Sequence, residues 1–207
     1  MNGPPFRCNK SEYLEPYRQE TQEDQETHMT PTPEILRADN EIPDMLWPFD
    51  FEVTDNAQYG PVWFDTAALA PFEVVAQRSS GCVYALVGPE RHVLLATSEG
   101  QAGIIAASLM ECLELVIAHP YWQDVVSRAT GELEAMRRIF RDGVKDFETD
   151  MLDDNPEIAD FRPQLRKRLG LDIARDPAGR LHHALTVLGA GVRLRVDDGS
   201  VAAPLFG

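Results

Sequence analysis

Candidates for catalytic or metal-binding chemistry are few in this sequence: adjacent histidines, His182 and His183, a cysteine, Cys112, and a glycine-rich turn at 99–103. Neighbouring residues on a helix point about 100° apart, so the two histidines do not chelate one metal ion. Cys112 lies within an apolar run, which favours a buried structural thiol over a nucleophile. The cysteines also lack the paired spacing of a zinc site. We therefore predict no catalytic residue, no cofactor and no metal site.

The turn at 99–103 would suit a phosphate group only if it were a P-loop at the start of a helix. It lacks the P-loop lysine, and Glu99 would repel an anion. Ser98 and Gln101 instead have the spacing of a capping box, in which each side chain satisfies a backbone amide of the other residue. We therefore interpret the turn as the capped start of a helix that ends at His119, before a proline.

This predicted helix is the element around which the rest of the chain is organised. From Ile104 to Ile117 nearly every residue is apolar or small, which is typical of a central, buried helix. Glu111 and Glu114 fall on one narrow stripe, and a solvated face is the default interpretation of such a pair.

Strands are predicted before the central helix, and further helices after it. The runs at 72–77, 82–87 and 92–97 form an antiparallel meander, and helical periodicity resumes beyond residue 120. Alternation at 192–196, an Asp198-Gly199 turn and a returning run at 200–206 predict a hairpin. The expected fold class is α+β: an antiparallel β-meander packed on a central buried helix, with additional C-terminal helices and a terminal β-hairpin.

The 207 residues divide by composition into three segments. Residues 1–33 are polar without apolar periodicity, and we expect a flexible N-terminal segment. Residues 34–128 should form the α+β core, and residues 129–207 a helical extension whose C-terminal hairpin packs on that core.

The formal net charge of −15 restricts the partners. It argues against nucleic acid, because phosphates would be repelled, and favours a basic protein. The alternative is that the charge serves solubility alone. We predict partner contacts at six acidic positions in two segments and at one aromatic anchor: Asp50, Glu52, Asp55, Asp153, Asp154, Glu157 and Trp122.

The sequence also predicts the cellular compartment of the protein and whether it contacts a membrane. No positively charged start is followed by an apolar stretch, and no apolar run is long enough to span a bilayer, so we expect no membrane partner. The three cysteines, Cys8, Cys82 and Cys112, are scattered and odd in number. Such cysteines are typical of free thiols in a reducing cytoplasm.

Residues 47–122 resemble the SUKH superfamily. The resemblance is carried by Phe72–Gln77, Gly81–Leu86, Leu94–Gly100 and Ala106–Leu113. In that family a strand meander with a small-residue turn is followed by a helix with the pattern sEG…a.S..e.L. Many bacterial members are immunity proteins that bind and neutralise a co-produced polymorphic toxin, often a nuclease. The recognition surface varies with the toxin, so the resemblance implies no individual binding residue.

We therefore expect a non-enzymatic immunity protein that occludes a basic, cognate toxin, as a monomer or weak homodimer. One alternative is a regulatory or scaffolding adaptor, the role that the resemblance implies for some eukaryotic relatives. Another is a hydrolytic enzyme, which would need a pocket with converging polar groups of perturbed pKa.

Overall fold

The computed structural model describes residues 30–60, 62–142, 144–196 and 199–205. Most of the predicted flexible segment, residues 1–29, lies outside these residues. Asp198 of the predicted terminal turn and Phe206 at the end of the predicted returning run also lie outside them. The first described helix begins at Pro33, where the Thr32 hydroxyl accepts a hydrogen bond from the amide of Ile35 at 3.3 Å. This side-chain cap and the proline at the first helical position explain why the helix starts here.

Six strands form one sheet in the described part of the chain, in the order β1-β2-β3-β4-β5-β6. Strands β1 to β5 are antiparallel neighbours, whereas β6 runs parallel to β5. The predicted α+β class and the antiparallel meander are confirmed. The strands are β1 (Glu52–Val53), β2 (Phe72–Gln77), β3 (Val83–Val87), β4 (His92–Ala96), β5 (Gln101–Ala106) and β6 (Ala203–Pro204).

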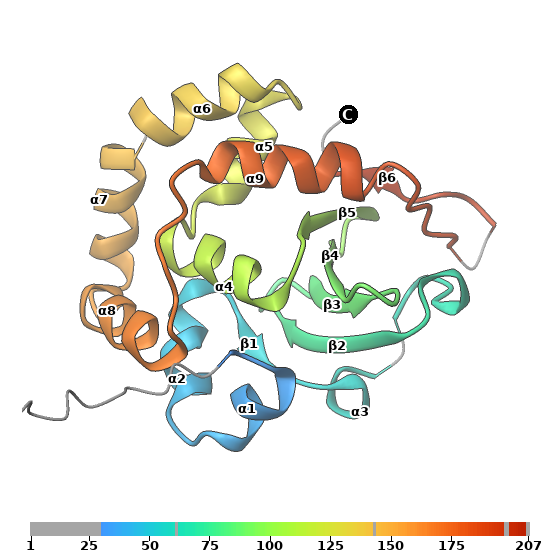
Figure 1. Ribbon diagram of the computed structural model, residues 1–207, viewed down its shortest axis with the longest axis horizontal. Helices are drawn as coiled ribbons and strands as arrows, with labels where there is room; N and C mark the ends of the chain where they lie inside the picture. The colour runs from blue at the N-terminus through green and yellow to red at the C-terminus, as the bar shows by residue number, and fades with distance from the viewer. Residues whose placement is uncertain (1–29, 61, 143, 197–198, 206–207) are drawn as a thin grey trace, which may run out of the picture.

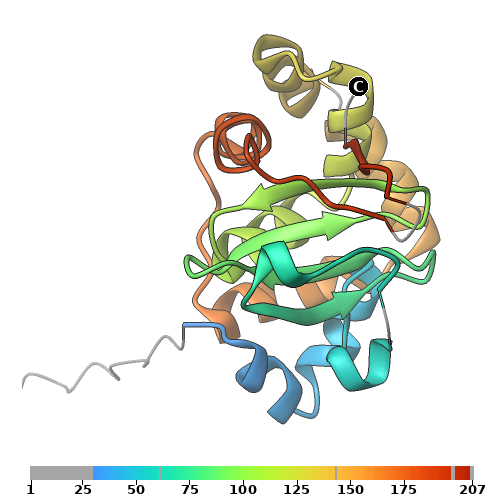
Figure 2. The same cartoon turned by 90° about the vertical axis from the view of Figure 1, so that its right-hand side faces the viewer.

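Helices surround the sheet, and α6, α7 and α8 follow one another in an arc beside α4 (Figures 1 and 2). Short 3-10 turns and one π-helical turn connect several of them. The helices are α1 (Pro33–Ala38), α2 (Ile42–Leu46), α3 (Asn56–Tyr59), α4 (Leu109–Ala118), α5 (Trp122–Ala129), α6 (Leu133–Asp142), α7 (Val144–Asp154), α8 (Ile158–Leu169) and α9 (Pro177–His183). The 3-10 turns are η1 (Trp47–Phe49) and η2 (Ala67–Leu69), and the π-helical turn is η3 (Ala184–Leu188).

The prediction of a helix starting near Ser98 is wrong, because 101–106 is a strand. Gly100 has a φ of 84° and allows the tight turn between β4 and β5. The β-branched pair Ile104 and Ile105 favours the extended backbone. The capping box that starts α4 lies ten residues later. The backbone amide of Glu111 donates to the Ser108 hydroxyl at 3.2 Å. The Glu111 carboxylate accepts from the backbone amide of residue 107 at 3.1 Å.

The sheet is buried on both faces, which explains its continuous apolar runs. One face packs on α4 through residues such as Tyr84 and Leu95. The opposite face packs on the segment around Phe64 and on the C-terminal segment around Leu194. The C-terminal hairpin is less regular than predicted: residues 195 and 201 form an isolated bridge, and β6 pairs with β5 instead.

Glu114 of α4 is not on a solvated face, and that prediction is wrong. Its side chain is 8% exposed because α9 and the segment before it cover this side of the helix. Arg180 donates to the carboxylate at 2.7 Å, and the amide of Asp172 donates to its other oxygen at 3.3 Å. A buried carboxylate is tolerated here because both oxygens have donors.

Replacing Arg180 with alanine should therefore destabilise the fold. The buried carboxylate of Glu114 loses its charged partner, and we expect the free energy of unfolding to fall by about 1–3 kcal/mol. Chemical denaturation of the two proteins measures this difference. Arg138→Ala, an exposed change on α6, is the matched control and should stay within about 0.5 kcal/mol of the parent. Equal effects of the two changes would contradict the assignment.

Candidate functional site: an acidic pocket

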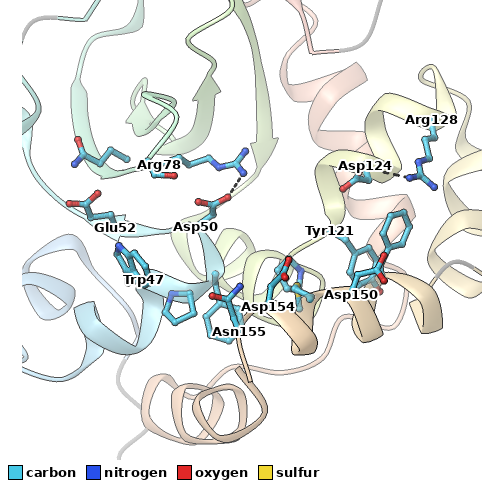
Figure 3. A pocket seen from close by; sticks show the side chains of 17 residues that line it. Trp47, Asp50, Glu52, Arg78, Tyr121, Asp124, Arg128, Asp150, Asp154 and Asn155 are labelled. Atoms are coloured by element: carbon cyan, nitrogen blue, oxygen red, sulfur yellow. Dashed lines mark hydrogen bonds and ion pairs between the residues drawn. The ribbon is translucent and has the colours of Figure 1, made fainter. Parts of the chain in front are cut away.

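Three of the predicted contact residues, Asp50, Glu52 and Asp154, meet at one pocket of about 560 Å³. The pocket lies between the η1–β1 corner, the end of β2, the start of α5 and helix α7 (Figure 3). About 100 residues of sequence separate its two walls. Its lining comprises Trp47, Pro48, Phe49, Asp50, Glu52, Gln77, Arg78, Ser79, Pro120, Tyr121, Asp124, Arg128, Phe147, Asp150, Met151, Asp154 and Asn155.

The first wall is shaped by the short η1 turn. Phe49 is buried in the core and fixes the turn, while Trp47 is turned outward and is 60% exposed at the rim. Asp50 ends the turn in the left-handed conformation, with a φ of 59°, and directs the chain into β1. An exposed tryptophan beside carboxylates is an unusual surface feature and suits a contact site.

The second wall is carried by α7, which Arg162 of α8 holds in place. Its guanidinium donates to both carboxylate oxygens of Glu148 at 3.0 Å and to the carbonyl of Ile117 at 2.9 Å. This bidentate pair links α7, α8 and the end of α4. It fixes the helix that presents Asp150 and Asp154 to the pocket.

The pocket carries five carboxylates and two arginines, a formal excess of three negative charges. Arg78 pairs with Asp50 and also donates to Gln123 of α5. Arg128 lies 4.0 Å from Asp124 and stacks over the ring of Phe147 at 4.7 Å. The remaining carboxylates have no hydrogen bond or ion pair with any residue that the structure describes: Glu52, Asp150 and Asp154.

Aromatic rings form the floor of the pocket beside α5. Tyr121 and Phe147 stack with centroids 5.0 Å apart, and the Tyr121 hydroxyl lies 3.0 Å from Nδ1 of His119. Burial raises the pKa of Tyr121 to about 12 and lowers the pKa of His119 to about 4. Both groups are therefore neutral at pH 7, and the floor adds apolar contact area without charge.

The other predicted contact residues lie outside this pocket. Trp122 is 2% exposed and packs in the core, so its prediction as a surface anchor is wrong. Helix α5 begins at Trp122, two residues after Pro120, and Trp122 belongs to its buried face. Asp55 caps α3 by accepting from the amide of Gln58 at 2.8 Å. Asp153 and Glu157 are near the end of α7 and the start of α8 but do not line the pocket.

Sequence reasoning missed several pocket residues. Trp47 stands in a dense apolar cluster, so its exposure depends on the fold. Asp150 carried a usable signal, because it lies four residues before Asp154 and so shares its helix face. Arg78 and Asp124 had no signal in the sequence that marked them as pocket residues, because their positions depend on contacts between distant segments.

The residues considered for metal or nucleophilic chemistry lie at positions typical of structural or surface residues. Cys112 is fully buried, and burial raises the pKa of its thiol far above the ordinary value. His182 is half-buried and His183 is exposed. Among the residues that the structure describes, no group of three or more His, Cys, Asp or Glu side chains is arranged to hold a metal ion.

No family model, curated protein or solved structure matches this chain. The SUKH resemblance thus stays a prediction from the sequence. Within the described ranges, no helix has both the length and the apolar character needed to cross a membrane.

Proposed function

We propose that this protein is a non-enzymatic binding protein whose acidic pocket receives a basic surface of a partner protein. The observation that carries this proposal is the set of three unpaired carboxylates that line one pocket, Glu52, Asp150 and Asp154, with the exposed ring of Trp47 at its rim. Several lysine or arginine side chains of the partner would pair with these carboxylates, and the one nearest Trp47 would contact the indole face.

Following the SUKH resemblance, we propose that the partner is a cognate bacterial toxin of the nuclease type. A nuclease must attract phosphates, so the surface around its active site is basic. An acidic protein that docks there competes with the nucleic acid and blocks the enzyme by stoichiometric occlusion. The net charge of −15 would accelerate the encounter at low ionic strength. Free, buried thiols at Cys82 and Cys112 support a cytoplasmic setting.

The test uses any toxin domain found to be encoded beside this gene, expressed as an inactive variant for binding and as active enzyme for inhibition. Calorimetry should show a one-to-one complex whose affinity falls as salt is raised from about 50 to about 500 mM. Nuclease activity should be lost at a molar ratio of one. Failure to bind any neighbouring toxin at the low salt concentration would overturn the immunity role. Capture of a partner without toxic activity would favour an adaptor.

A further inference from the structure

A second concave surface lies on another part of the molecule, between α6, the segment joining α8 to α9, and the end of α9. Helices α6 and α9 lie side by side there (Figure 1). This mixed-charge groove has a volume of about 1040 Å³ and shares no lining residue with the acidic pocket. Its lining comprises Leu133, Arg137, Asp172, Ile173, Arg175, Asp176, Gly179, Arg180, His182, His183, Thr186 and Val187.

Exposed apolar side chains gather at this groove. Large hydrophobic side chains with high exposure in the described residues are Trp47, Ile173, Val187 and Val201. Ile173 is 55% exposed and Val187 is 58% exposed, and both line the groove. Trp47 belongs to the acidic pocket. The groove therefore combines two of these apolar side chains with a concave surface, a combination typical of protein contacts.

The groove is also less acidic than the acidic pocket. Three arginines and two aspartates line it, so it carries a formal excess of one positive charge without the histidines. Arg137 is paired with Asp176 at 2.8 Å, and Arg180 with buried Glu114 at 2.7 Å. The side chains of Asp172 and Arg175 have no hydrogen bond or ion pair with a residue that the structure describes.

These two unpaired charges flank Ile173 in the short sequence Asp172-Ile173-Ala174-Arg175. The segment is complementary to itself. When two copies meet antiparallel about an axis between residues 173 and 174, Asp172 of each copy lies opposite Arg175 of the other. The exposed Ile173 side chains of the two copies then lie near the axis, with opposite charges on both sides, as in an isologous contact.

We infer that the chain forms a two-fold homodimer centred on this segment, with the mixed-charge groove receiving side chains of the second copy. A net charge of −15 makes two copies repel each other. The groove is a face where this repulsion is locally relieved and where apolar area is available. Because it shares no lining residue with the acidic pocket, each copy keeps its pocket open in the dimer.

The test is a charge-reversal experiment on the full chain. Sedimentation velocity over a concentration series should show a monomer–dimer equilibrium. Asp172→Arg places arginine opposite Arg175 on both sides of the axis, and Arg175→Asp places aspartate opposite Asp172. Each change should raise the dimer dissociation constant about tenfold or more, because like charges meet. Asp172→Arg makes the whole chain less negative. If repulsion between the net charges governed association, this variant would therefore have a lower dimer dissociation constant than the parent.

Mixing the two variants should restore association, because every facing pair is again of opposite sign. Native mass spectrometry should then detect the heterodimer in preference to either homodimer. Ile173→Glu should also yield monomer, whereas Val201→Glu, at a valine of similar exposure elsewhere (53%), should not. Thermal melts of each variant confirm folding. A parent chain that stays monomeric, or a dimer unchanged by the two reversals, or a mixture without heterodimer, would each overturn the inference.

Discussion

Neutralising the three unpaired carboxylates of the acidic pocket should slow association with the basic partner about tenfold or more at low ionic strength. The variant combines Glu52→Gln, Asp150→Asn and Asp154→Asn. These side chains have no cation partner in the described structure, so their loss breaks no ion pair and the fold should be retained. Stopped-flow or surface-plasmon measurement of the association rate constant with the partner proposed above gives the result. The difference should shrink at high salt, where the field is screened.

A matched control separates the pocket from total charge. Glu90→Gln, Asp153→Asn and Asp160→Asn change the net charge by the same amount at exposed positions outside the pocket. Asp153 also adjoins Asp154 on α7, so this control tests the pocket against the general acidity of that helix. We expect a small effect on the rate. Equal slowing by both triple variants would mean that overall charge steers the encounter and that the pocket is not the contact site.

Lowering the pH from about 7.5 to about 4.5 should remove about 2–3 kcal/mol of stability through His119 alone. Burial lowers the pKa of this imidazole from 6.5 to about 4, an effect that nearby Glu148 partly opposes. Its ring lies edge-on to Phe140 with centroids 5.1 Å apart, and its Nε2 is buried with no partner among the described residues. The folded protein therefore has little capacity to accept a proton here.

The direction of the effect follows from where the proton binds. Below pH 6.5 the unfolded chain protonates this histidine, whereas the folded chain does so only near pH 4. The contribution is therefore fully present above pH 6.5 and is lost as the pH falls through the window between the two values. Urea unfolding at both pH values measures the total loss, which also includes the carboxylates.

The variant His119→Phe isolates the histidine, because the ring contacts are kept and the titrating group is removed. Its stability should fall by about 2–3 kcal/mol less than that of the parent over the same pH change. His183→Phe replaces an exposed histidine and should behave as the parent does. An unchanged pH dependence in His119→Phe would show that this imidazole is not kept neutral by burial.

Local patterns in the sequence predicted several elements correctly. Strand β2 occupies Phe72–Gln77 as expected, and β3 and β4 differ from expectation by one residue at one end. Apolar runs bounded by glycine and proline depend on neighbours in the chain, so such elements can be recognised without the fold. The start of α4 could not be recognised in this way, because two capping-box patterns occur in this stretch and either could begin a helix. Pairing of 101–106 with β4 decides between them.

Burial of individual side chains was decided by packing between distant segments. Glu114 looks solvated in the sequence, yet α9 covers it and supplies Arg180. Trp122 follows a helix break and looks available, yet it is enclosed by the core. Helical spacing specifies which residues share a face but not what covers that face.

The sequence by itself determined the α+β class, the strand meander, the buried body of α4 and the negative charge of −15. Only the tertiary structure decided where that charge is unpaired. Folding brings Arg78 to Asp50 and Arg180 to Glu114, while Glu52, Asp150 and Asp154 converge from distant segments without a described cation. Pairing acts over a few ångströms in space, so the order of residues along the chain does not reveal which charges remain available to a partner.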